Sequence, residues 1–361
     1  GEWKMLSEKS LNFLEQLLKC SGPSGFEIET AAVYRKYLSQ FAHKVYTDVT
    51  GNTIGVLNEK ADFKVMLAGH YDEIGFQVVH ISDEGLLYFR NVGGIDKITV
   101  PGTEVEILTE KGKIHGVIGK KPIHLTEEKD RSQVIELKNL WIDIGAENKK
   151  EAEKTVRVGD PVAVKTNFTR LGKNRIMSKG MDDKIGAFVV AETLRELSAR
   201  KINISVYGVG TVQEELGLRG ATTSAFGIAP NVGFAVDVGF ATDTPDIEKK
   251  TLGSVVLGKG PILSRSADDN PVVCKILRET AKRKNIKIQE KAGFRASGGT
   301  DTAQIQMTRG GVATSLIGIP NRYMHTPVEI CDLRDVEGAI KLLTETIAQL
   351  KPGTTFIPGI D

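Results

Sequence analysis

Two adjacent glutamates, Glu214 and Glu215, follow an apolar, strand-like run in the segment VYGVGTVQEELGLRG (206–220). Gly217 and Gly220 come directly after them, so the backbone can turn tightly and approach a ligand closely. Burying a carboxylate at the end of a strand is costly unless a positive charge meets it. A divalent metal would supply that charge, with one glutamate as ligand and the other as general base. The alternative is a charged, solvated loop between a strand and a helix.

Four further apolar runs adjoin residues that can ligate metals. His70 and Asp72 follow the run 64–68, and Asp182-Asp183 precede an apolar helical pattern at 185–197. Asp237 ends the run NVGFAVDV, and His325 follows the run 314–319. Open α/β sheets bind ligands at the carboxyl ends of their strands. Because five such places occur in one chain, we expect these side chains to form a single site.

The spacing within two of these motifs indicates different roles for neighbouring residues. His70 and Asp72 lie two apart, so in a strand their side chains share a face. An imidazole that ligates a metal usually donates its other N–H to a carboxylate, which predicts His70 as ligand and Asp72 as its orienting partner. A buried core histidine is the alternative. Of Asp182 and Asp183, one can bridge two metals while the other caps the following helix.

The motifs GHYDEIGF, SKGMDDKIGA, VQEELGLRGA, VDVG, GGTDTAQIQ and HTPVE resemble, in the same order, those of the M42 metallo-aminopeptidases. That family includes the tetrahedral (TET) aminopeptidases, glutamyl aminopeptidase, and relatives labelled cellulase M or endoglucanase. The resemblance extends from about residue 6 to about residue 350. It implies an α/β/α sandwich of the phosphorylase/hydrolase-like kind, with an inserted small, PDZ-like β-barrel that serves subunit contacts.

The resemblance also implies a co-catalytic two-metal aminopeptidase that removes N-terminal residues from peptides. It assigns one ion to His70, Asp182 and Asp237, and the other to Asp182, Glu215 and His325, with a cis peptide bond after Asp182. Glu214 is then the general base that activates a metal-bridging water, supported by Asp72. Imidazole and carboxylate ligands without thiolates suit zinc first, and also cobalt or manganese.

Two other functions are weighed against this one. An endo-1,4-β-glucanase needs two carboxyl groups across a sugar, one of them kept protonated. Here the acids occur with two histidines, which suits metal ligation better, and aromatic residues make up only 6% of the chain. A non-catalytic scaffold of the same fold is disfavoured because all five expected ligands and Glu214 are present.

The order of predicted elements indicates an insertion. Helical patterns are expected at 6–18, 26–38, 182–200, 271–284 and 335–350, and they alternate with strands at both ends of the chain. Between them lie short β-type runs, typical of a small barrel or sandwich. We therefore predict a catalytic α/β domain from residues 1–74 and 171–361, and an inserted β domain at 75–170 for oligomerisation.

Composition excludes several classes of protein. The net charge of +2 and the lack of a long basic block argue against nucleic-acid binding. No apolar run reaches membrane-spanning length and no leader pattern is seen, so a cytoplasmic location without membrane contact is expected. The widely spaced Cys20, Cys274 and Cys331 are expected to be free thiols. The resemblance implies a homo-oligomer, with the dodecamer of the TET relatives as the reference.

Some polar residues keep two interpretations. By resemblance, His124 is a candidate to reach a neighbouring subunit's site, although it is also an ordinary surface or core histidine. Arg219 and Arg295 fit either a specificity pocket or a solvated loop. Asp301, which follows Gly298, Gly299 and Thr300, is expected to cap the next helix or support the site rather than to contact substrate. Residues 287–291 are expected to form a polar edge strand that belongs to the scaffold.

Overall fold

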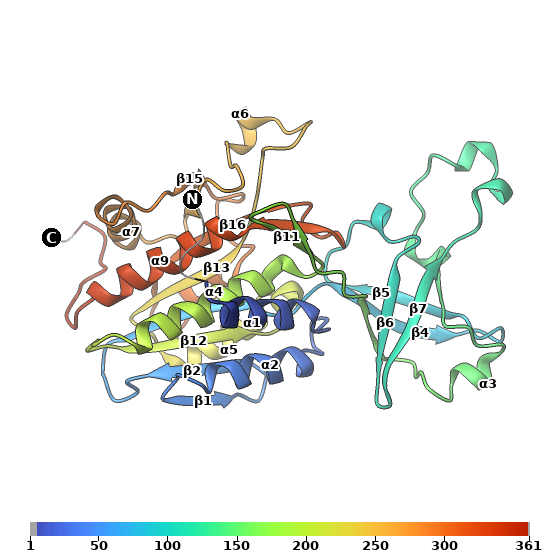
Figure 1. Ribbon diagram of the computed structural model, residues 1–361, viewed down its shortest axis with the longest axis horizontal. Coiled ribbons are helices and arrows are strands. Elements are labelled where there is room, and N and C mark those ends of the chain that lie inside the picture. Colours follow the sequence, from blue (N-terminus) through green and yellow to red (C-terminus); the bar gives the residue numbers. More distant parts are fainter. Residues whose placement is uncertain (1–5, 360–361) are drawn as a thin grey trace.

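The computed structural model describes residues 6–359 and has two parts (Figure 1). One is an eleven-stranded mixed sheet covered by helices, and the other is a closed six-stranded barrel. The barrel projects from one end of the sheet part. The predicted α/β/α sandwich with a small β-barrel is confirmed, and the choice left open between barrel and sandwich is settled as a barrel.

The sheet has its parallel strands in the middle. Its main path runs β1-β2-β12-β3-β13-β16-β17-β11-β10, and β14 joins β16 and carries β15 beyond it. β12, β3, β13 and β16 are parallel neighbours, so their carboxyl ends meet at one edge. The strands are β1 (Lys44–Thr47), β2 (Thr53–Leu57), β3 (Lys64–His70), β10 (Thr169–Leu171), β11 (Arg175–Ser178), β12 (Ser205–Thr211), β13 (Val232–Phe240), β14 (Ile262–Arg265), β15 (Gln289–Ala292), β16 (Ala313–Arg322) and β17 (Glu329–Asp332).

Helices cover both faces of the sheet. The larger core contains apolar side chains of α1, α2, α4, α7 and α9, and a smaller core on the other face contains those of α5 and α8. Strands buried between two such layers read as continuous apolar runs, as β12 does. The helices are α1 (Glu8–Lys19), α2 (Ile28–Leu38), α4 (Met181–Ser198), α5 (Arg219–Ile228), α7 (Pro271–Arg283), α8 (Asp301–Gln306) and α9 (Leu333–Gln349), with the short α6 (Lys249–Leu252) in a loop.

The start of α4 lies unusually close to β3. A Cβ atom on Gly69 would come within 2.6 Å of the backbone of Gly186 and Ala187, so only glycine permits this approach. Asp182 and Asp183 have non-helical backbone angles inside α4, and the peptide bond between them is cis. The close contact places the first turn of α4 beside the end of β3.

The barrel has a hydrophobic core of its own, built around Phe76, Val105 and Ile142. All of its strand pairs are antiparallel, and β9 closes the ring by pairing with both β4 and β6. Its elements are β4 (Gly75–Ile81), β5 (Leu87–Val92), β6 (Glu104–Thr109), β7 (Gly112–Gly119), β8 (Trp141–Asp143), β9 (Pro161–Val164), α3 (Lys149–Ala152) and the 3-10 turns η1 (Lys97–Thr99), η2 (Ile123–Leu125), η3 (Glu128–Asp130) and η4 (Leu137–Asn139). A separate core is what lets such a unit fold as an insertion.

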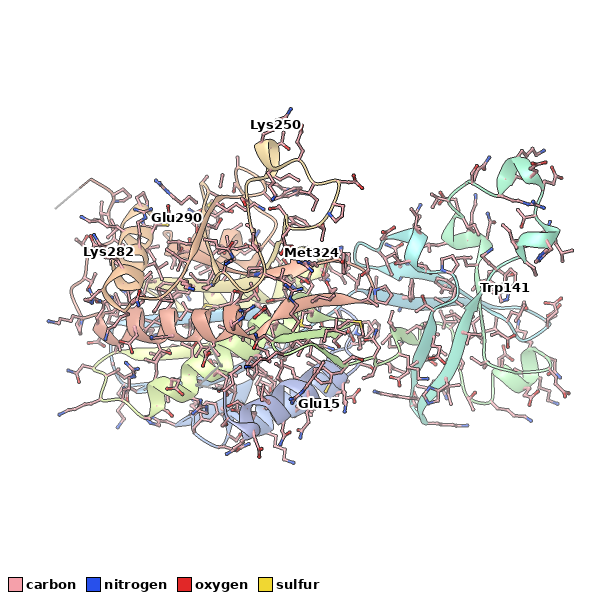
Figure 2. All side chains as sticks on the ribbon, turned by 45° about the horizontal axis from the view of Figure 1, so that its top comes forward. Glu15, Trp141, Lys250, Lys282, Glu290 and Met324 are labelled. Carbon is pink, nitrogen blue, oxygen red and sulfur yellow. The ribbon has the colours of Figure 1, made fainter. Side chains whose placement is uncertain are left out.

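Side chains fill both parts, with Trp141 in the barrel and Met324 in the sheet part (Figure 2). Cys20, Cys274 and Cys331 are buried and free, as expected. Among the residues described, no helix combines the length and apolar character needed to cross a membrane.

Candidate metal centre

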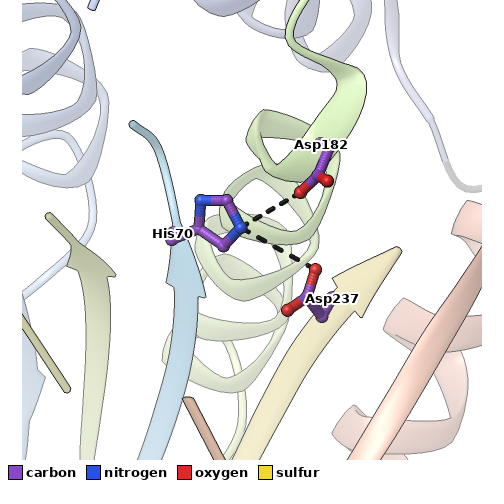
Figure 3. Close-up of side chains that lie close together, drawn as sticks. All are labelled: His70, Asp182 and Asp237. Atoms are coloured by element: carbon purple, nitrogen blue, oxygen red, sulfur yellow. Dashed lines mark ion pairs between the residues drawn. The ribbon is translucent and has the colours of Figure 1, made fainter. Parts of the chain in front are cut away.

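Side chains from five segments meet at the carboxyl edge of the parallel strands. β3 ends at His70, and β13 carries Asp237 near its end. Asp182 lies at the start of α4, as the close-up of this group shows (Figure 3). Glu214 and Glu215 form the 3-10 turn η5 (Glu214–Leu216) after β12, and His325 follows β16. The convergence follows from the strand order, because β12, β3, β13 and β16 are adjacent.

Asp182 lies between the two imidazoles. Its Oδ1 is 3.1 Å from Nε2 of His70, and its Oδ2 is 3.2 Å from Nε2 of His325. On the first side, His70 Nε2 is also 3.8 Å from Asp237 Oδ1. On the second side, His325 Nε2 is 3.4 Å from Glu215 Oε1. The carboxylate of Asp182 therefore belongs to two separate groups of potential ligand atoms.

Three groups of side chains bring their ligand atoms within 4.8 Å of one another. Two of these groups have the same members as the two ligand sets that the resemblance implies. The geometry therefore fits the predicted ligand sets, and metal binding by these residues stays a prediction. The third group makes Glu214 a competing ligand candidate. The groups are His70, Asp182 and Asp237; Asp182, Glu215 and His325; and His70, Glu214 and Glu215.

Asp72 holds several of these groups in position. Its Oδ1 lies 3.3 Å from Nδ1 of His70 and accepts the backbone N–H of Glu214 at 3.0 Å. Its Oδ2 accepts the N–H of Glu215 at 3.2 Å and the hydroxyl of Ser24 at 2.5 Å. One fully buried carboxylate thus orients the imidazole and fixes the turn that carries both glutamates.

Glu329, in the motif HTPVE, plays a similar part on the other side. Its Oε2 accepts the backbone N–H of Asp182 at 3.1 Å, and its Oε1 accepts that of His325 at 3.2 Å. Asn321 donates to Oε1 as well. The sequence does not predict this role of Glu329, because a bond to the distant backbone N–H of Asp182 leaves no local pattern. Only its place four residues after His325 could have drawn attention to it.

Two other acidic residues, Asp183 and Asp301, lie near the site, and only Asp183 caps a helix. Asp183 accepts the N–H of Gly186 at 3.0 Å, so it caps the regular part of α4 as predicted. Asp301 does not cap α8, because Thr300 occupies the N-cap position, and the capping interpretation was wrong. Asp301 is instead buried and accepts the hydroxyl of Thr211, at the end of β12, at 2.5 Å.

The cluster carries an excess of buried negative charge. Burial raises the pKa of Glu214 and of Asp237 well above their usual values, although His70 opposes the shift. Burial acts against protonated His70, but Glu214 and Asp72 outweigh it and raise the pKa of its imidazole. Hydrogen bonds to Asp182 and Glu215 raise the pKa of His325 to about 11. Close-set acids that hold nearby imidazoles protonated are suited to exchange those protons for divalent cations.

A cavity of about 310 Å³ opens over the cluster. His70, Asp182, Glu214, Glu215, Asp237 and His325 all line it. Arg295 also lines this cavity, whereas Arg219, at the start of α5, is not among its lining residues. His124 lies in η2 of the barrel part, outside the cavity of the described chain.

The chain is similar to known aminopeptidases over most of its length. A model of the family described as M42 glutamyl aminopeptidase matches residues 51–342. A lysyl aminopeptidase of Pyrococcus furiosus is 37% identical over 94% of this chain and 97% of its own length. A TET aminopeptidase structure from Thaumarchaeota archaeon SCGC AB-539-E09 has a TM-score of 0.91 at 36% identity, covering 96% of this chain and 97% of that one. A TET1 peptidase of Pyrococcus horikoshii, which can assemble into a tetrahedron or a large octahedral shell, has a TM-score of 0.85 at 34% identity, covering 94% and 100%.

Proposed function

The chain belongs to the M42 aminopeptidase family, and from this premise we propose that it cleaves N-terminal residues from peptides with two divalent cations. One cation would be held by His70, Asp182 and Asp237, and the other by Asp182, Glu215 and His325. The observation that carries this proposal is the position of Asp182, whose two oxygens face different imidazoles. Zinc is the first candidate, with cobalt or manganese as alternatives.

The residues around the cations divide the remaining work. When bound, the cations polarise the scissile carbonyl and make water easier to deprotonate. Glu214 takes a proton from the attacking water and delivers it to the departing amine. Burial by itself raises the pKa of Glu214, and nearby dications would lower it again, so that the carboxylate is ionised and ready to accept a proton. Asp72 fixes the positions of Glu214 and His70 relative to each other, because its Oδ1 accepts the backbone N–H of Glu214 and lies beside Nδ1 of His70.

Replacing Glu214 tests the assignment of the base. We expect Glu214→Gln to retain both cations and to lose turnover by about 10²-fold or more. Hydrolysis of leucine p-nitroanilide and elemental analysis of the purified protein measure the two properties separately. Glu279→Gln, which changes an exposed glutamate on α7, is the matched control. Normal turnover would refute the role of base, and loss of a cation would make Glu214 a ligand instead.

The glucanase alternative is tested with the same preparation. Carboxymethylcellulose replaces the anilide, and each substrate is assayed with and without a chelator. We expect only the anilide to be cleaved, and only without chelator. If the protein still hydrolysed carboxymethylcellulose after its metal was removed, the proposal of a two-metal aminopeptidase would be contradicted.

We also propose that the chain forms a homo-oligomer through the inserted part, residues 75–170, with the TET dodecamer as the reference. The P. horikoshii TET1 relative assembles into large shells, and several large apolar side chains of the barrel part are exposed to solvent: Ile98, Ile123, Leu125 and Val134. Free, buried cysteines fit a reducing, cytoplasmic setting. The substrates would then be peptides able to enter such an assembly.

A further inference from the structure

Three consecutive backbone N–H groups in the turn after β12 donate to two buried carboxylates. The N–H of Gln213 donates to Oε1 of Glu27 at 3.0 Å. The N–H groups of Glu214 and Glu215 donate to the two oxygens of Asp72 at 3.0 and 3.2 Å. The turn that carries the proposed base is therefore held at its first residue by Glu27, which lies at the end of the loop between α1 and α2.

The backbone conformation of Gln213 makes this restraint important. Its φ of 53° and ψ of 35° lie in the left-handed region, which residues with a Cβ atom seldom adopt. Such a conformation persists only where the surrounding contacts enforce it. The carbonyl of Gln213 is bonded within the same turn, to the N–H of Arg219 at 3.2 Å, whereas its N–H is anchored to Glu27. Because Gln213 directly precedes Glu214, its φ and ψ decide where the Glu214 side chain lies.

Glu27 is itself fixed in place. Its side chain is only 6% exposed, and the same Oε1 accepts the N–H of Gly25 at 2.7 Å. In the same loop, Ser24 donates its hydroxyl to Asp72 at 2.5 Å. The loop therefore supports the turn in two ways, directly through Glu27 and indirectly through Asp72.

We propose that Glu27 is a positioning residue that holds Glu214 in place for proton transfer. This inference rests on the proposed aminopeptidase function. Glu27 is not among the residues that line the cavity, and it belongs to none of the ligand groups found in the described chain. It therefore acts through the turn, whereas Asp72 also lies beside Nδ1 of His70. Removal of Glu27 should displace the base and leave the cations bound.

The first test compares Glu27→Ala with wild type in the hydrolysis of leucine p-nitroanilide by the metal-loaded full chain. Alanine has no oxygen to accept the N–H of Gln213, so the turn loses its anchor. We expect kcat to fall by about tenfold or more, while KM changes less than about threefold. Elemental analysis should still find two zinc ions per chain.

Glu27→Gln tests whether the acceptor oxygen is what matters. Its amide oxygen can accept the same two N–H groups. A neutral side chain also suits this position, because burial, and next the charge of Asp72, raise the pKa of Glu27 to about 7. This variant should restore most of the lost turnover. Glu248→Ala is the matched control, because Glu248 likewise directly precedes a helix, α6, but is exposed, and it should leave kcat unchanged.

A double-mutant cycle separates positioning of the base from a general loss of folded enzyme. Glu27→Ala is also made in the Glu214→Gln protein, whose residual turnover no longer depends on the base. If Glu27 acts through Glu214, this residual turnover should change less than about threefold, because the effects of two coupled residues do not add. If Glu27 merely stabilises the fold, the factor lost in the wild-type background should be lost again.

The inference is overturned if Glu27→Ala keeps its kcat, loses a zinc ion or lowers turnover by the same factor in both backgrounds, or if Glu27→Gln is as slow as Glu27→Ala. Glu27→Asp, whose carboxylate is one methylene shorter, replaces Glu27→Ala in these comparisons if the latter does not fold. A metal-loaded wild type that cleaves no amino-acid p-nitroanilide would instead overturn the proposed function.

Discussion

Glu329 shows how a residue outside the expected ligand set can control it. Its two carboxylate oxygens accept the backbone N–H groups of Asp182 and His325. Both residues belong to the ligand group formed by Asp182, Glu215 and His325. A bond to the backbone sets the direction in which the ligand side chain points. Residues that orient metal ligands in this way commonly contribute tenfold to a hundredfold to affinity.

We therefore expect Glu329→Gln to weaken one of the two cation sites by about 10–100-fold, since an amide cannot accept all the bonds that the carboxylate accepts. The site formed by His70, Asp182 and Asp237 should change less, because only Asp182 is shared. Calorimetric titration of the metal-stripped protein with zinc resolves the two equivalents. If zinc affinity fell equally at both sites, or at neither, the expectation that Glu329 supports only the site of Asp182, Glu215 and His325 would be contradicted.

At the scale of single residues, spacing predicted which side chains should gather and that Asp72 would orient His70, but it gave no indication of the part played by Glu329. His70, Asp182, Glu214, Glu215, Asp237 and His325 were all expected at one edge because each adjoins an apolar run. The bond of Glu329 to the distant backbone N–H of Asp182 has no sequence signature. Residues 287–291 were predicted only as a scaffold strand, although Lys291 lines the cavity, because alternation shows that residues share a face and not which cavity that face lines.

A second group of charges joins the elements beneath the site. Glu73, just after β3, lies 2.6 Å from Lys179 Nζ and 3.1 Å from Lys184 Nζ. It also accepts the N–H of Gly22 at 2.9 Å, and both lysines donate to the carbonyl of Cys20. All three charged side chains are buried. The group ties the loop after α1 and the start of α4 to the point where the chain leaves β3 for the barrel.

Glu73→Gln should destabilise the fold by about 3–5 kcal/mol at pH 7, because two buried ammonium groups lose their counter-ion. Burial alone would raise the pKa of Glu73, but Lys179 and Lys184 lower it from 4.5 to about 2. As the pH falls, the unfolded chain therefore binds a proton at Glu73 before the folded chain does. The contribution of the Glu73 carboxylate to the free energy of unfolding is complete above pH 4.5 and falls as the pH drops toward 2.

Urea unfolding of both proteins at pH 7, 4.5 and 3 checks this expectation. The advantage of wild type over Glu73→Gln should shrink by about 1–2 kcal/mol between pH 4.5 and 3. Exposed Glu279→Gln serves as the control and should cost little at any pH. A difference that stays constant across this interval would show that Glu73 is not held ionised by the lysines.

Elements with a local cause were predicted well. α9 was expected at 335–350 and spans Leu333–Gln349, and α7 begins at Pro271, where proline suits the first turn. Closure of the barrel was not predictable, because it depends on β9 pairing with β4 and β6, strands that lie far away in the sequence. Likewise, the close approach of Gly69 to α4 is a tertiary contact that no local sequence pattern predicts.

At the scale of the whole molecule, the barrel stands apart from the sheet part (Figure 1), and its loops present apolar side chains to solvent. Ile123 and Leu125, in η2, are 46% and 66% exposed. Isolated apolar residues are common on protein surfaces, but neighbouring ones on a projecting unit are a frequent feature of subunit interfaces. A charge placed there would have to be buried on association, which is costly without a partner.

We expect the double variant Ile123→Asp, Leu125→Asp to lower the mass of the assembly, as measured by size-exclusion chromatography with light scattering, while the protomer keeps its thermal stability. Ile28→Asp is the matched control, since Ile28 is 85% exposed on α2 in the sheet part. If the η2 surface forms the contact, only the double variant should dissociate, and the loss should be greater at lower protein concentration because association follows mass action. An assembly unchanged by the double variant, or broken equally by Ile28→Asp, would place the contact elsewhere and remove the barrel loop from the proposed interface.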